Sequence, residues 1–189
     1  MSNDKRISDA MEQALNKQMM EEATQAQAYI ALGSWAEVNN YPGIADFFYK
    51  HSAEERNHMF KFLAYINERG GEAKIEAIPA PRDNPVSLET CIEDVWQHEL
   101  ENSKKIYALV DQAMAERDWA TFNFLQWFVK EQIEEEALIT YVINLPWHQK
   151  IRRITKASMS WIKTWHQLLK KVICHGKNRW NNFCHHKKS

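Results

Sequence analysis

Five glutamates and one histidine stand where a helical chain of this kind should be apolar: Glu22, Glu55, His58, Glu99, Glu131 and Glu135. An ionised carboxylate in an apolar interior costs several kcal/mol without a partner, or takes up a proton instead. Glu55 and His58 are one helical turn apart on the same face, and such O and N ligands suit first-row metals. Five carboxylates and one imidazole can neutralise and share two di- or trivalent ions, which predicts a buried dinuclear metal site.

The elements that carry these residues are four segments in which apolar residues recur at steps of three and four, the pattern of an amphipathic helix. They span residues 7–39, 44–70, 88–113 and 124–142. Short breakers at 39–43 and 116–118 predict two antiparallel hairpins, and Ser87 is a candidate N-cap. Residues 71–86 hold three prolines and can run the length of a bundle. We expect an all-α fold, an antiparallel four-helix bundle with one long crossover.

The six polar residues have matching heights in this bundle. Each lies roughly 14 to 18 residues from the turn of its own hairpin, so each hairpin brings its polar residues together near mid-height. A single glutamate on a helix stripe is usually a solvated residue, and a lone His58 would more often be a satisfied interior histidine than a ligand. Acidic residues at mid-height on four separate helices favour a metal site over solvated glutamates and a structural histidine.

Composition supports a globular helical protein. Hydrophobic residues make up 44% of the 189 residues, with only 5 Gly and 5 Pro, which excludes a disordered or collagen-like chain. No apolar run reaches the roughly 18 to 20 residues of a membrane span, and the first ten residues lack a signal-peptide core. We therefore expect a cytoplasmic location. Cys91, Cys174 and Cys184 form no disulfide framework.

The charge is divided sharply along the chain. Residues 1–136 hold 13 Lys and Arg against all 25 Asp and Glu, a balance of 13 − 25 = −12, whereas residues 137–189 hold 11 Lys and Arg and no acid. Four of the eight tryptophans and five of the eight histidines also lie in residues 137–189. We therefore expect a bundle over residues 1–144 and a divergent basic tail over residues 145–189.

Three segments, HSAEERNHM (51–59), WQHE (96–99) and TFNFLQWFVKEQIEEE (121–136), resemble the bacterial non-haem ferritins, a resemblance that extends over residues 7–143. It implies a ferroxidase centre, in which Glu22, Glu55 and His58 hold one iron, Glu55 bridges, and Glu99 with Glu135 holds the second. Gln132 stands where bacterioferritins and rubrerythrins would have a second bridging glutamate. The resemblance further implies a third iron site near the centre, with Glu54, Glu131 and Glu134, and a role for Tyr29 as electron donor.

The function implied is iron storage and detoxification, in which Fe²⁺ is oxidised to Fe³⁺ by O₂ or H₂O₂ and stored as ferric mineral in a shell of 24 subunits. No haem is expected. One alternative is a peroxide-consuming diiron protein of the rubrerythrin type, against which the missing second bridging glutamate counts. The other alternative is an assembly-defective remnant whose basic tail contacts nucleic acid or a membrane. The iron-storage interpretation includes neither of these partners.

The tail departs from the family, because residues 145–189 do not resemble the short fifth helix of ferritins. One explanation is a frameshift, since permitted codons for residues 145–167 read in another frame give a sequence similar to an ordinary ferritin C-terminus. The other is a recruited basic helix with Trp161, Trp165 and Leu168 on one face. A zinc site is a further, weaker interpretation, based on the tail residues Cys174, His175, Cys184, His185 and His186.

Overall fold

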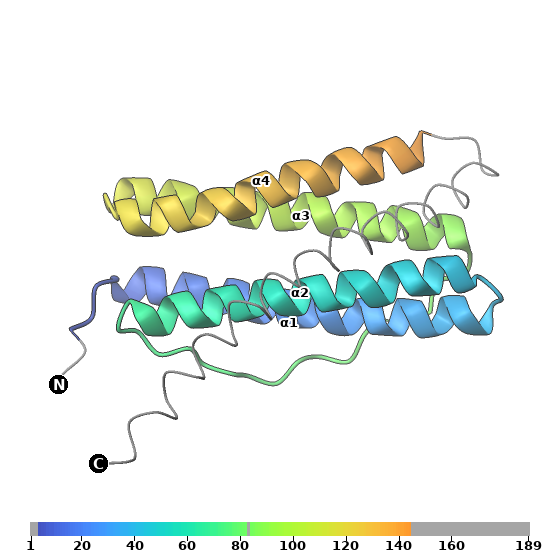
Figure 1. Cartoon of the computed structure of the whole chain (residues 1–189), viewed down its shortest axis with the longest axis horizontal. Coiled ribbons are helices and arrows are strands. Elements are labelled where there is room, and N and C mark those ends of the chain that lie inside the picture. The colour runs from blue at the N-terminus through green and yellow to red at the C-terminus, as the bar shows by residue number, and fades with distance from the viewer. Residues whose placement is uncertain (1–3, 83, 145–189) are drawn as a thin grey trace, which may run out of the picture.

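The computed structural model describes residues 4–82 and 84–144, which form four helices (Figure 1). These are α1 (Asp9–Val38), α2 (Pro42–Glu68), α3 (Leu88–Ala115) and α4 (Trp119–Ile143). Helices α1 and α2 form one antiparallel hairpin, α3 and α4 form the other, and a long segment crosses between them along the bundle. The predicted all-α bundle with one crossover is confirmed. The predictions for residues 145–189 lie outside the described residues.

Local chemistry sets the helix ends. The Ser8 and Ser87 hydroxyls each accept a backbone N–H in the first turn of α1 and α3, at 2.9 Å and 3.2 Å, so the predicted N-cap at Ser87 is confirmed. Helix α2 starts at Pro42, where the missing N–H would have had no helical partner. These signals place each helix, and hence each stripe of side chains, in a fixed register.

The crossover is held against α1 by a few polar contacts. The Asn16 amide donates to the Glu72 carbonyl at 2.9 Å and accepts from the Lys74 N–H at 2.7 Å. The turn that starts the crossover needs a glycine, because Gly70 has a φ of +80° and a Cβ there would lie 2.9 Å from the Asp4 carbonyl oxygen. The chain can therefore leave α2 and return along α1.

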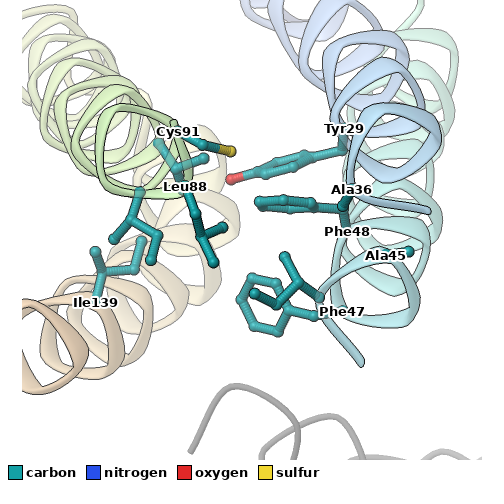
Figure 2. Close-up of a cluster of buried hydrophobic side chains, with 11 residues drawn as sticks. Tyr29, Ala36, Ala45, Phe47, Phe48, Leu88, Cys91 and Ile139 are labelled. Atoms are coloured by element: carbon teal, nitrogen blue, oxygen red, sulfur yellow. The ribbon is translucent and has the colours of Figure 1, made fainter. Parts of the chain in front are cut away.

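Two apolar clusters fill the ends of the bundle. The cluster at the α1–α2 turn contains Tyr29, Ala36, Ile44, Ala45, Phe47, Phe48, Leu88, Cys91, Ile92, Val95 and Ile139, most of which Figure 2 labels. The opposite cluster contains Met11, Leu15, Met19, Phe62, Ile66, Ile106, Leu109, Ala113, Leu125 and Phe128. Between them lies a layer of buried polar side chains, which we call the polar layer: Gln18, Glu22, His51, Glu55, His58, Glu99, Asn102, Ser103, Gln132 and Glu135.

The two hairpins lie beside each other as separate layers (Figure 1). Helix α1 approaches α3 across the bundle, whereas the described parts of α2 and α4 do not come comparably close. None of the four described helices combines the length and the apolar content needed to cross a bilayer. The backbones of the two hairpins therefore come closest between α1 and α3.

Candidate metal centre

Three residues of the polar layer form a compact group, which we call the trio: Glu22, Glu55 and His58. The His58 Nδ1 atom lies 3.0 Å from Glu55 Oε2 and 3.6 Å from Glu22 Oε2. One ligand atom from each residue falls within 4.8 Å of the others, and all three residues are buried. Residues 55 and 58 are adjacent on the α2 stripe, and the α1–α2 hairpin brings Glu22 to the same height.

The trio shares protons when no metal is bound. Burial disfavours the charged form of His58, but the pairing of His58 with the Glu22 and Glu55 carboxylates outweighs burial and raises the His58 pKa well above its ordinary value. Burial raises the pKa of Glu55 well above its usual range. Burial also favours the protonated form of Glu22, but the interactions of Glu22 with His58 and Glu55 outweigh burial and lower the Glu22 pKa. Any cation entering this group must therefore displace protons.

The other two buried acids, Glu99 on α3 and Glu135 on α4, form what we call the pair. The Tyr29 hydroxyl donates to Glu99 Oε1 at 2.6 Å, and Gln132 Nε2 lies 3.4 Å from Glu99 Oε2. Burial and the charge of Glu135 raise the pKa of Glu99 to about 7, against the effect of the Tyr29 hydrogen bond. Burial and the same carboxylates raise the Tyr29 pKa well above its usual value.

His51 is the partner of Glu135. Its Nε2 atom lies 3.5 Å from Glu135 Oε2, and its Nδ1 atom lies 3.8 Å from Glu54 Oε2. Burial disfavours the imidazolium, but the charge of Glu135 outweighs it and raises the His51 pKa to about 9. The Glu135 pKa is lowered because His51 more than compensates for burial. His51, Glu54 and Glu135 form a second group of possible metal ligands within 4.8 Å.

The predicted ligands differ in how far they reach the interior. Glu54 and Glu131 lie at the edge of the polar layer, where burial raises the pKa of both. Glu134 is half exposed and pairs with Lys130 at 3.6 Å. The structure therefore brings together the trio, and it brings His51 and Glu54 to Glu135. It places neither Glu99 nor Glu134 in a group of three ligands within 4.8 Å.

Unsatisfied atoms show that the centre suits a cation. Glu22 Oε2 and Glu135 Oε2 are buried and make no hydrogen bond, a state that native interiors rarely tolerate without a role for the atom. One such oxygen belongs to the trio and the other to the pair. Carboxylates with one or two imidazoles are the O and N donors that Fe²⁺ and Fe³⁺ accept. The donor set therefore fits iron on both sides of the polar layer.

Four residues of this layer, His51, Gln18, Asn102 and Ser103, were absent from the predicted site. His51 lies four residues before Glu55 on the stripe of α2, and that spacing was the available signal. Gln18 lies four residues before Glu22, and Asn102 lies three residues after Glu99, so both share faces with predicted ligands. Their hydrogen bonds cross between helices, which spacing within one helix does not reveal.

The four-helix fold and a buried carboxylate–histidine centre define a ferritin-like protein, and comparison with known proteins agrees. The model of the ferritin-like domain family matches residues 12–146. A probable bacterial non-heme ferritin-like protein of Haemophilus influenzae is 38% identical over 138 residues, which cover 73% of this chain and 84% of the relative. A bacterial non-heme ferritin of Staphylococcus saprophyticus is 42% identical over 125 residues, 66% of this chain and 75% of the relative.

Solved structures give the same answer. The open pore ferritin of Archaeoglobus fulgidus superposes with a TM-score of 0.75 at 32% identity, covering 80% of this chain and 96% of that one. An engineered closed form of the same ferritin gives a TM-score of 0.71 at 34% identity, covering 84% and 94%. The chain belongs to the ferritin family of iron-storage proteins, and the resemblance drawn from the three sequence segments is confirmed.

Proposed function

We propose that the protein is a ferroxidase that oxidises Fe²⁺ at the polar layer and passes Fe³⁺ to storage. One iron binds the trio, and the second binds Glu99 and Glu135 with Glu55 between the two positions. Two Fe²⁺ ions each give one electron, so together they supply the two electrons that convert O₂ and two protons to H₂O₂, or H₂O₂ to two hydroxide ions. The observation that carries the proposal is the convergence of five buried ligands from four helices.

The chain's own residues prepare the site for this reaction. The protons held by the trio leave when the first iron enters, which keeps the buried charge low both before and after binding. Tyr29 holds one oxygen of Glu99 and lies where a phenol can give an electron to the centre. Glu54 and Glu131, with Glu134 after release from Lys130, lead from the centre toward the surface and are proposed ligands of a third iron.

Storage requires a container, and we propose that copies of this chain form a hollow shell as the family does. The acidic balance of residues 1–136 favours the attraction of cations into such a shell. Size-exclusion chromatography with electron microscopy tests this step. A particle of many subunits that retains iron after gel filtration supports storage, and a monomer or dimer that retains none contradicts it.

The oxidation step is tested by adding Fe²⁺ to the metal-free protein in air and following ultraviolet absorbance. We expect a rapid phase that saturates near two irons per chain and disappears in Glu55→Ala. Glu68→Ala is the matched control, because it removes an exposed glutamate from the same helix and should leave the rapid phase intact. A wild-type protein without a rapid phase would reject the proposal.

A further inference from the structure

Three uncharged amide side chains are buried within the polar layer and come from three helices. Gln18 lies on α1, Asn102 on α3 and Gln132 on α4, with 3%, 4% and 4% of their surface exposed. A buried amide is costly unless its donors and acceptors are paired. We call this set the amide chain, because hydrogen bonds connect its members in that order.

The α1 end of the amide chain is tightly bonded. Gln18 Nε2 donates to Glu22 Oε1 at 2.6 Å and to Asn102 Oδ1 at 2.7 Å. An amide NH₂ has two protons, and both are used here. The reversed amide would point its oxygen at the Glu22 carboxylate, which can only accept when ionised. Glu22 therefore fixes the direction of Gln18, and Gln18 in turn fixes Asn102 with its oxygen toward α1 and its NH₂ group toward α4.

The α4 end continues in the same direction but is looser. Asn102 Nδ2 donates to Gln132 Oε1 at 3.4 Å. Gln132 Nε2 then faces three oxygens of α3, at 3.2 Å from Ser103 Oγ, 3.3 Å from the Glu99 carbonyl and 3.4 Å from Glu99 Oε2. The amide chain thus presents an N–H to a trio carboxylate at one end and to a pair carboxylate at the other.

Packing alone does not require this arrangement. Residue 102 lies on the buried stripe of α3 with Val95, Ile106 and Leu109, a position where apolar side chains are the usual choice and where leucine has the same branching as asparagine. The asparagine there connects the two hairpins through its bond to Gln18 on α1, and it is the sole member of the amide chain that bonds to both of the others. The three amides are also uncharged, so they can transmit a change in hydrogen bonding without adding charge to the centre.

We propose that Asn102 is a positioning residue that couples the two iron positions, so that iron at the trio promotes binding at the pair. The proposal rests on the two-iron function above. Metal at Glu22 withdraws electron density from that carboxylate and weakens its hold on Gln18. Gln18 then donates more strongly to Asn102, which strengthens the donation from Gln132 to Glu99 and holds that side chain in the orientation that binds the second metal. Couplings of this kind typically change affinity about 5- to 150-fold.

The test is an anaerobic titration of the metal-free full chain with Co²⁺, which does not react with the protein by redox chemistry and reports each bound ion by visible absorbance and heat. Wild type and Asn102→Leu are compared. We expect the first binding step to change less than about twofold and the second to weaken about tenfold, within the usual range for partners outside the ligand set. Asn102→Ser, which retains a short polar group, covers the case in which the leucine variant does not fold.

Thr121→Val is the matched control, because Thr121 is buried in the first turn of α4, outside the polar layer. It bonds to Tyr65 and Asp118 but not to the amide chain. It should leave both steps unchanged. Equal weakening of both steps in the Asn102 variants, or two unchanged steps, overturns the coupling and leaves the two-iron function standing. A wild-type protein that binds no second Co²⁺ rejects the two-iron function, and the coupling with it.

Discussion

The trio and the pair lie in one polar layer, yet different neighbours hold their oxygens. In the trio, Glu55 and Glu22 lie within 3.6 Å of the same His58 nitrogen, so the ligands hold one another. In the pair, Glu99 is held by Tyr29 at 2.6 Å and Glu135 faces His51 at 3.5 Å. A metal entering the trio replaces shared protons and can reach Glu22 Oε2, which makes no hydrogen bond, although Gln18 holds the other oxygen of Glu22. Glu99 of the pair has protein donors at both of its oxygens. We therefore expect the trio to fill first.

The largest effect is expected from Glu22→Gln, which removes a trio carboxylate and keeps its shape. Loss of a partner that only supports a ligand costs about 10- to 100-fold in metal affinity, so loss of a ligand should weaken the first Co²⁺ step by more than about 100-fold. Calorimetry of the metal-free protein measures it.

Glu21→Gln is the control for this change, because Glu21 is the neighbouring acid on α1 and pairs with Lys105 at the surface. If Glu22→Gln bound the first ion as tightly as wild type does, the trio would not be the first position.

The next effect concerns the pair without metal. Because the His51 pKa is raised from 6.5 to about 9, its pairing with Glu135 stabilises the fold fully below pH 6.5, and this stabilisation is lost as pH rises through 9. The shift corresponds to on the order of 3 kcal/mol. Urea unfolding at pH 6 and pH 9 should show a smaller fall in stability for His51→Gln than for wild type. Equal falls would show that His51 is not charged in the folded protein.

The four helices could be predicted from sequence because their signals are local. Apolar spacing, the Pro42 break and the Ser87 cap each act within a few residues, and the match of heights in each hairpin follows from helix geometry. The family resemblance covered the ligands of the trio and the pair. What escaped prediction depends on distances between helices: His51 was visible as a member of its stripe, but its approach to Glu135 on α4 is set by how the two hairpins pack.

The same limit explains Asn102 and Glu134. Asn102 lies on the buried face of α3, but no pattern within that helix indicates partners on α1 and α4. Glu134 came from the family resemblance alone, and it lies about 100° around the helix from Glu135, which is why it is exposed and paired with Lys130. Periodicity predicts which face a residue occupies, and packing decides which residue it meets.

A smaller effect is expected from Tyr29→Phe, which releases one oxygen of Glu99 while keeping the ring that packs against Phe48. Loss of a buried hydrogen bond should lower the free energy of unfolding by about 1 to 2 kcal/mol. The Glu99 pKa should rise above about 7, because the Tyr29 hydroxyl opposes the increase caused by burial. At pH 6 the second Co²⁺ step should therefore weaken while the first stays the same. A change confined to the first step would contradict the assignment of Tyr29 to the pair.

The smallest effect separates folding from metal binding. Ser87 caps α3, the helix that carries Glu99, but its hydroxyl bonds to Thr90 in the first turn, three turns from Glu99. Ser87→Ala should lower the free energy of unfolding by about 1 kcal/mol without changing either Co²⁺ step, because buried residues from Leu88 to Ala113 hold the register of α3. If the second Co²⁺ step weakened along with the stability of the protein, the position of Glu99 would depend on the overall stability of α3. The contrast between the trio and the pair would then come from unequal helix stability, with no special part for Tyr29, Gln132 and His51.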